Sequence, residues 1–162
     1  MALDERRTQA FFALMEAGGL LEMLMEEQLR REGGISYLQF FLLARLAQAP
    51  QGRMRMTDLA DTVVHSRSGL TYQAGKLEDS GLLRREPSEE DERSVSAVIT
   101  DEGRQVLEKV LPGHVEVVER GMFDALDDAQ AAALADALGA VRDRLRGLTP
   151  SSSERRRSRG RG

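Results

Sequence analysis

The chain has 162 residues, of which 41% are hydrophobic and 31% charged, and it contains no cysteine. This size and composition are typical of one globular domain, and the lack of cysteine excludes disulfides, thiolate metal ligands and thiol-based redox sensing. The formal net charge is −4. Because residues 149–162 hold five arginines and one glutamate, a charge of +4, the preceding 148 residues carry −8. Such an acidic body disfavours non-specific nucleic-acid binding, although a local basic surface stays compatible with it.

No apolar run approaches the ~20 residues that span a bilayer. The N-terminal stretch carries acidic residues and lacks a secretory cleavage signal, so the expected location is cytoplasmic.

Two helices are expected in the first third of the chain. Apolar residues at helical spacing predict one long helix over residues 3–32, closed by Gly33 and Gly34. The next stretch, ISYLQFFLLARLAQAP, predicts a second helix, because Ser36 and Gln39 have capping-box spacing and Pro50 follows its end.

The middle of the chain predicts two short helices and a hairpin. RMRM at 53–56 is compatible with a strand, and Thr57 would cap a short helix over 58–63. A turn then leads to a second helix over 66–80. Residues 82–86 and 94–99 flank an acidic tip and predict a β-hairpin, in whose second strand Val95, Ala97 and Ile99 alternate with Ser94, Ser96 and Val98. This order is that of a winged helix-turn-helix, in which the second helix enters the major groove.

Two more helices are expected after the hairpin. One would start at Thr100 and run to about residue 126, with a kink or break at Pro112 and Gly113. The last would begin at Asp127 and run to about residue 148, and an arginine-rich, disordered tail would follow. The expected fold is mainly α with a small β-hairpin: a winged helix-turn-helix flanked by long N- and C-terminal helices whose apolar character calls for dimerisation.

Polar side chains gather on the first turns of the helix predicted over 66–80, where a recognition helix meets base edges and phosphates. They are Ser66, Arg67, Ser68, Thr71, Tyr72, Gln73 and Lys76. Leu70, Ala74 and Leu77 would face the core. A polar helix face is more often merely solvated, but the hairpin directly behind this helix favours DNA binding.

Residues 56–103 resemble the MarR family of bacterial transcription regulators. They read MTDLADTVVHSRSGLTYQAGKLEDSGLLRREPSEEDERSVSAVITDEG. The resemblance lies in the ordered set of LA, S-x-S-x-L-T, KLEDSGLLRR, D-x-R-S and ITDEG, and the flanking helices extend it to about residue 148. It implies a dimeric regulator, most often a repressor, that binds a palindromic operator and in many members responds to a small molecule. It also implies a division into N-terminal helices (1–50), the DNA-binding domain (51–100), C-terminal dimerisation helices (101–148) and a tail (149–162).

The resemblance assigns roles in the wing. Arg93 would reach the minor groove, Asp91 would orient nearby arginines, and Arg84 and Arg85 at the wing's base are candidates for phosphate contacts, which weaken as salt rises. Small aromatic or phenolic effectors bind many family members between the dimer helices and the DNA-binding lobe. Candidate ligand residues, chosen as aromatic, apolar or cationic groups on the first two helices, are Phe12, Met15, Tyr37, Phe41 and Arg45.

Other functions have weaker support. The two histidines, His65 and His114, fit no local metal-ligand spacing, and no nucleophile–base, P-loop or dinucleotide motif indicates an enzyme or a bound cofactor. A PadR-like regulator would place the winged helix near the start of the chain. A winged-helix module that binds proteins instead of DNA stays open as an alternative, supported by the acidic body.

Overall fold

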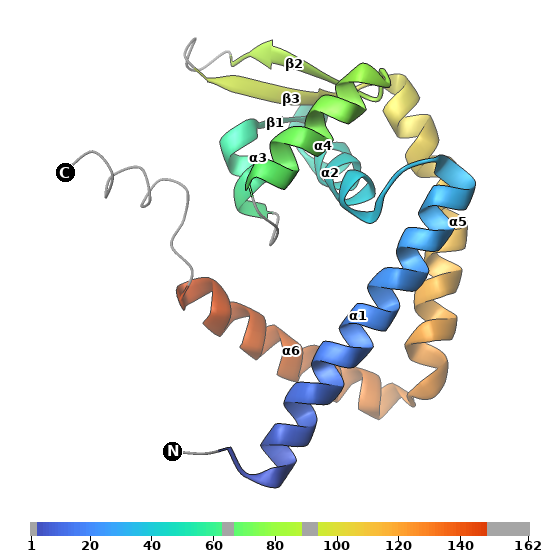
Figure 1. Cartoon of the computed structure of the whole chain (residues 1–162), viewed down its shortest axis with the longest axis vertical. Coiled ribbons are helices and arrows are strands. Elements are labelled where there is room, and N and C mark those ends of the chain that lie inside the picture. Colours follow the sequence, from blue (N-terminus) through green and yellow to red (C-terminus); the bar gives the residue numbers. More distant parts are fainter. Residues whose placement is uncertain (1–2, 63–66, 89–93, 149–162) are drawn as a thin grey trace, which may run out of the picture.

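The structure is a computed structural model that describes residues 3–62, 67–88 and 94–148. In this part of the chain the elements follow the expected order (Figure 1). They are α1 (Glu5–Gly33), α2 (Tyr37–Gln48), the 3-10 turn η1 (Pro50–Gly52), β1 (Arg53–Arg55), α3 (Met56–Thr62), α4 (Arg67–Asp79), β2 (Leu83–Pro87), β3 (Val95–Ile99), α5 (Asp101–Gly121), the 3-10 turn η2 (Phe123–Ala125) and α6 (Asp128–Leu148).

The hairpin gains a third strand. β1 pairs with β3 and β3 with β2, all antiparallel, in the order β1-β3-β2. Two details of the sequence reading are wrong. Helix α3 begins at Met56, so Thr57 lies inside it and is not its cap. The expected alternation along β3 is absent, since Ser96 to Ile99 are all buried and Val95 is exposed. Ala97 and Ile99 belong to the core, while Val98 lies between the long side chains of its cross-strand partners Arg53 and Arg84, which can cover it.

One apolar core joins α2 to the winged helix. Leu42, Leu43 and Leu46 of α2 are fully buried and pack with residues from α3, α4, β2 and β3. Fully burying a leucine contributes roughly 1.5–3 kcal/mol. Helix α2 is therefore the central support of the DNA-binding lobe as well as part of the N-terminal helical segment.

Helix α1 contacts α2 near its C-terminal end, and its N-terminal half is exposed. The side chain of Asp4 accepts a hydrogen bond from the Arg7 backbone, and Gly34, with φ of 66°, ends the helix as expected. Near that end the Glu26 carboxylate accepts from the Tyr37 backbone N–H at 2.5 Å. The N-terminus of α2 is thus capped twice, by Glu26 and by the predicted Ser36–Gln39 capping box.

Helix α5 runs alongside the C-terminal part of α1 and is continuous through Pro112, so the expected break there is wrong. Packing on α1 outweighs the usual cost of an internal proline, about 3 kcal/mol. The Gln28 side chain of α1 donates to the Val110 carbonyl of α5 at 3.1 Å. Gly113 permits this approach, because an added Cβ would lie 2.4 Å from a carboxylate oxygen of Glu32.

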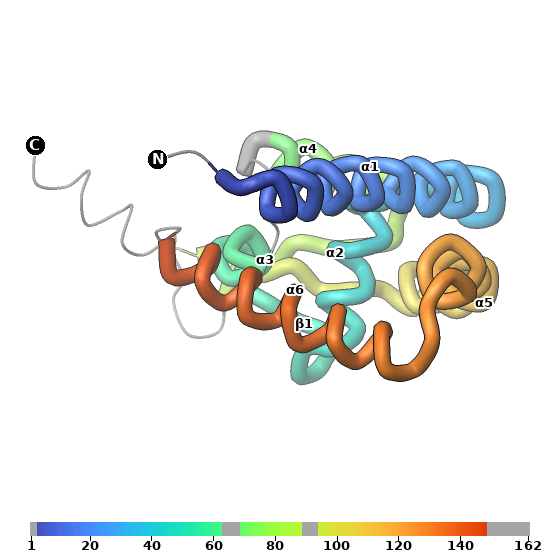
Figure 2. Tube along the Cα trace, turned by 90° about the horizontal axis from the view of Figure 1, so that it is seen from below, coloured from blue at the N-terminus to red at the C-terminus, as the bar shows by residue number. Residues whose placement is uncertain are grey.

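Helix α6 reaches away from the rest of the protomer. Its predicted capping box is present, with Asp127 and Gln130 each accepting from the other's backbone N–H at 2.8 and 2.9 Å. None of its residues is buried. Although α6 crosses α1 in the view of Figure 1, the turned view of Figure 2 separates the two helices. The N-terminal half of α1 and all of α6 thus form two arms below the DNA-binding lobe.

Gly103 joins the lobe to α5, and we expect Gly103→Ala to lower the free energy of unfolding by about 1–3 kcal/mol, the usual cost of overpacking. An added Cβ there would lie 2.2 Å from the backbone carbonyl of Leu82, which cannot rotate aside. Gly75→Ala on α4 is the matched control, since nothing lies within 4 Å of a Cβ at that helical position either. It should leave the protein as stable or stabilise it by up to ~1 kcal/mol. Denaturant unfolding at one protein concentration measures both, and equal stabilities would contradict the account.

His114 should make stability depend on pH. Its ring packs on Phe40 at 4.4 Å, and burial lowers its pKa from the ordinary 6.5. The folded state then binds fewer protons than the unfolded state below about pH 6.5, so the stability given by the neutral ring is lost as the pH falls through the folded pKa. When the pH is lowered from about 7 to about 5, the melting temperature of His114→Phe should decrease less than that of the wild type. Parallel pH profiles would contradict this.

Candidate nucleic-acid interface

Helix α4 has one buried side and one exposed side. As the sequence predicts, Leu70, Ala74 and Leu77 are at most 2% exposed and anchor the helix in the core. Thr71, Tyr72 and Lys76 are exposed, and Gln73 is half-buried. The short helix α3 precedes α4, and the α4 side away from the core carries hydroxyl, phenol and ammonium groups. These groups can hydrogen-bond base edges and phosphates.

Several predicted contacts cannot be placed as side chains. Ser66, Asp91 and Arg93 lie outside the described residues. Arg67 and Ser68 begin α4, and only their backbone is described. The assignments of these five residues therefore stay predictions.

At the base of the wing, Arg85 holds the end of the recognition helix. Its guanidinium Nε donates to Glu78 of α4 at 2.7 Å and its backbone N–H donates to the same carboxylate at 3.0 Å. A second guanidinium nitrogen completes the ion pair. This contact lowers the pKa of Glu78 and raises that of Arg85. Both side chains are about one-third exposed, so the pair chiefly fixes geometry and adds little stability.

A second carboxylate spans the sheet. Glu86 of β2 accepts from Arg84 at 2.5 Å and from Arg53 of β1 at 2.8 Å. Arg84 and Arg53 both lie opposite Val98 of the central strand, so one row crosses all three strands. Of the two predicted phosphate contacts, Arg84 is the more exposed, at 58% of its side chain against 35% for Arg85.

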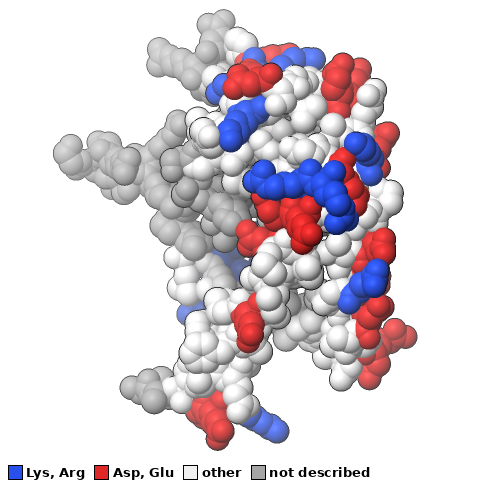
Figure 3. Space-filling view, turned by 45° about the vertical axis from the view of Figure 1, so that its right-hand side comes forward, with Lys and Arg blue, Asp and Glu red and all other residues white. Residues whose placement is uncertain are grey.

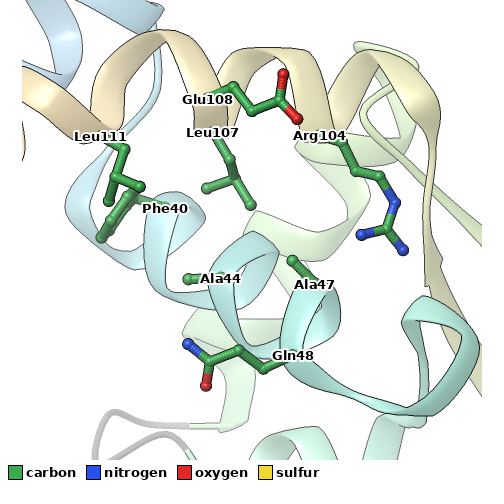
Figure 4. Close-up of a pocket in the computed structure, with 8 residues that line it drawn as sticks. All are labelled: Phe40, Ala44, Ala47, Gln48, Arg104, Leu107, Glu108 and Leu111. Carbon is green, nitrogen blue, oxygen red and sulfur yellow. The ribbon is translucent and has the colours of Figure 1, made fainter.

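A pocket of about 270 Å³ lies between α2 and α5. Phe40, Ala44, Ala47 and Gln48 line it from α2, and Arg104, Leu107, Glu108 and Leu111 line it from α5. In Figure 4, Leu107 and Leu111 point toward α2, while Arg104 extends toward the η1 turn. There its guanidinium lies over Gly52, where no side chain interferes. The lining is mostly apolar and carries one cation, Arg104, and one carboxylate, Glu108, which suits a small, largely apolar ligand with a polar group.

The predicted ligand residues lie elsewhere. Phe12 and Met15 are exposed on the N-terminal half of α1. Tyr37, Phe41 and Arg45 are half-buried on α2, where the Arg45 guanidinium lies 5.0 Å from the centre of the Phe41 ring. Burial and the charge of Glu22 raise the pKa of Tyr37. None of the five lines the α2–α5 pocket. Arg45 and Phe41 contact each other, whereas Phe12 and Met15 lie on the N-terminal half of α1, and a role of the five in binding a ligand stays a prediction.

The sequence did not predict the roles of Glu78 and Glu86 or the α2–α5 pocket. Glu78 and Arg85 are seven residues apart across a turn, a spacing with no local rule. The pocket joins residues about 60 positions apart in the chain. Only the repeat of small and apolar residues on α2 hinted at a groove there.

Within the described residues, no cluster of acidic or histidine side chains could hold a metal ion. The helices of that same part of the chain are also too short or too polar to cross a membrane.

A bracing helix, an apolar-backed recognition helix and a three-stranded wing sheet define a winged helix-turn-helix protein that binds DNA. The sequence model of the MarR family matches residues 33–94. The transcriptional regulator PecS of Dickeya dadantii is 33% identical over 113 residues, covering 68% of this chain and 67% of that protein. This chain belongs to the MarR family and is a DNA-binding transcription regulator.

Solved structures of MarR family regulators are also similar to this chain. Sco3205 of Streptomyces coelicolor, a MarR family regulator crystallised with DNA, is 36% identical, with 93% of this chain and 96% of that chain covered and a TM-score of 0.84. AbsC from the same organism is 33% identical, with coverage of 91% and 99% and a TM-score of 0.83. The likeness extends beyond the winged helix to nearly the whole chain.

The Glu78–Arg85 contact should matter more for DNA binding than for stability. Glu78→Gln removes the charge that holds Arg85, so we expect weaker operator binding and a stability loss of about 0–1 kcal/mol, as for partly exposed pairs. Glu116→Gln is the matched control, because it breaks the Glu116–Arg120 pair on α5 (3.1 Å) away from α4. Fluorescence anisotropy with labelled DNA measures the affinities. Tighter binding by Glu78→Gln would contradict the positioning role and make Arg85 a phosphate contact that Glu78 restrains.

Proposed function

We propose that this regulator works as a homodimer, binds a palindromic operator as a repressor, and is released from DNA by a small ligand. The observation that carries the proposal is the apolar surface left uncovered on α1 and α6, next to a lobe whose helix α4 exposes Thr71, Tyr72 and Lys76. The partner, the operator and the ligand each rest on a separate argument.

The dimer follows from exposed apolar side chains. On α1, Phe12 and Met23 are 64% and 59% exposed, and on α6 Val141 and Leu145 are 45% and 55% exposed. Figure 3 shows acidic and basic groups interspersed over the face in view, with mostly uncharged surface in its lower part, where the N-terminal half of α1 lies. Apolar surface of this extent marks an interaction site. A second copy, with the same surface, covers it symmetrically.

Two copies present two recognition helices. A symmetric dimer binds a palindrome when these helices enter major grooves one helical turn apart, roughly 34 Å. Arg93 would then reach the flanking minor groove with Asp91 orienting it, while Arg84 would contact phosphates. The residues that touch DNA in this scheme are Ser66, Arg67, Ser68, Thr71, Tyr72, Gln73 and Lys76 on the helix and Arg84 and Arg93 in the wing. The related Sco3205, crystallised with DNA, supports DNA binding by this fold.

The ligand site is the pocket between α2 and α5. Its volume suits one aromatic ring. Arg104, turned from Gly52 into the pocket, would supply a cation for a carboxylate or phenolate, and Glu108 would accept a hydrogen bond from a neutral polar group of the ligand. The pocket lies where the DNA-binding lobe meets the long helix α5. A ligand bound there releases DNA only if it prefers the arrangement of lobes that does not fit the operator.

The full chain should bind duplex DNA taken from the region next to its own gene. Arg93→Ala should weaken that binding by ~1–3 kcal/mol, the scale of one good specific contact. Anisotropy titrations at two salt concentrations measure this, since phosphate contacts alone would change the salt dependence. Failure of the wild type to bind any duplex would reject the proposal in favour of a protein-interaction module. Unchanged binding by a folded Arg93→Ala would remove Arg93 from the mechanism.

A further inference from the structure

The recognition helix carries a tyrosine and a lysine that contact each other. Lys76 Nζ lies 4.7 Å from the centre of the Tyr72 ring, a distance at which an ammonium is attracted to an aromatic face. Tyr72 is 60% exposed and Lys76 is exposed too. The two side chains stand on the side of α4 opposite the buried Leu70 and Ala74. They are therefore available to DNA as a preassembled pair.

No carboxylate competes for the Lys76 ammonium among the residues that the structure describes. Glu78, two positions away, is engaged by Arg85. Asp79 follows by one turn, but helical side chains lean toward the N-terminus, which carries Lys76 away from Asp79 and over Tyr72. The position four residues before a lysine is where a helical acid would pair with it. Tyr72 occupies that position, so the ammonium is held without being neutralised.

Tyr72 and Lys76 together present an apolar ring surface and a charged hydrogen-bond donor. One face of the Tyr72 ring lies under the ammonium, and the exposed edge and remaining face are apolar. In the major groove the matching apolar group is the C5-methyl of thymine. The ammonium keeps N–H donors directed away from the ring, and the long lysine side chain has less freedom left to lose on binding.

We propose that Tyr72 and Lys76 read DNA as one unit. The Tyr72 ring packs on a thymine methyl, and it holds Lys76 so that the ammonium donates to the acceptors on the major-groove edge of a neighbouring base. Tyr72 is thus a specificity-determining residue and also a positioning residue for Lys76. The inference rests on the proposed function, because it requires α4 to lie in the major groove.

The ring contact is tested by removing single methyl groups from DNA. The full-length wild type first selects its preferred duplex from a random pool. Each thymine in one half-site is then replaced by uracil, which lacks only the methyl. We expect a loss of about fourfold at one position, the value of one buried methyl-sized group, and no loss at that position for Tyr72→Ser. Thr71→Ala, next along the helix, should keep the wild-type sensitivity. A uniform response at all thymines overturns the ring contact.

The coupling is tested by a double-mutant cycle on the same duplex. Tyr72→Phe keeps the ring and should bind within about twofold of the wild type, since both rings attract a cation. Tyr72→Leu should bind more weakly. In the presence of Lys76→Met, part of that loss should vanish, giving a coupling of about two- to fivefold. Circular dichroism confirms that each variant is folded.

The possible outcomes distinguish failure of the Tyr72–Lys76 pair from failure of the proposed operator binding. A wild type that enriches no sequence overturns the proposed operator binding and this inference together. Specific binding by the wild type with strictly additive variants overturns only the coupled pair. If Lys76→Met lowers the salt slope by about one per site and leaves the sequence preference unchanged, Lys76 is a phosphate contact, and the base-reading role is wrong.

Discussion

The apolar surface along the N-terminal half of α1 and along α6 is the constraint on which the rest of the structure depends. A helix such as α6, with no buried residue in the protomer, lacks within its own chain the packing that supplies most of the stability of helices in proteins. The proposed dimer would bury Phe12, Val141 and Leu145 and would also set the distance between two recognition helices. Folding, assembly and operator geometry then follow from one surface.

The DNA-binding lobe contacts the long helices α1 and α5, which lead into these arms, at two places. Glu26 of α1 caps α2, and Thr100 at the start of α5 donates to the Gly81 carbonyl at 2.7 Å beside the close approach of Gly103. The α2–α5 pocket lies between the two attachments. A ligand there would act on the angle between lobe and arms, and in the proposed dimer this angle would set the spacing of the two recognition helices. Within the lobe, Glu78 and Arg85 fix the wing relative to α4.

Local signals predicted most of the fold. The capping boxes at Ser36 and Asp127 and the glycine after α1 mark helix ends through contacts within four residues, and they are read correctly. Pro112 is also a local signal, yet α5 continues through it because packing against α1 prevails. The site divides in the same way. The two sides of α4 follow from helical periodicity, whereas the Glu78–Arg85 pair and the pocket depend on tertiary approach that no spacing in the sequence encodes.

The central claim is that the exposed apolar surface of α1 and α6 forms a dimer interface. Analytical sedimentation of the full chain, with one charge placed in that surface, tests it most directly. Val141→Glu puts a carboxylate into the apolar stripe of α6, while Ala140→Glu adds the same charge about 100° around the helix. The account predicts a dimer for the wild type and Ala140→Glu, and a monomer with weakened operator binding for Val141→Glu. A wild type that sediments as a monomer at micromolar concentration, or a Val141→Glu variant that stays dimeric and binds DNA normally, would contradict it.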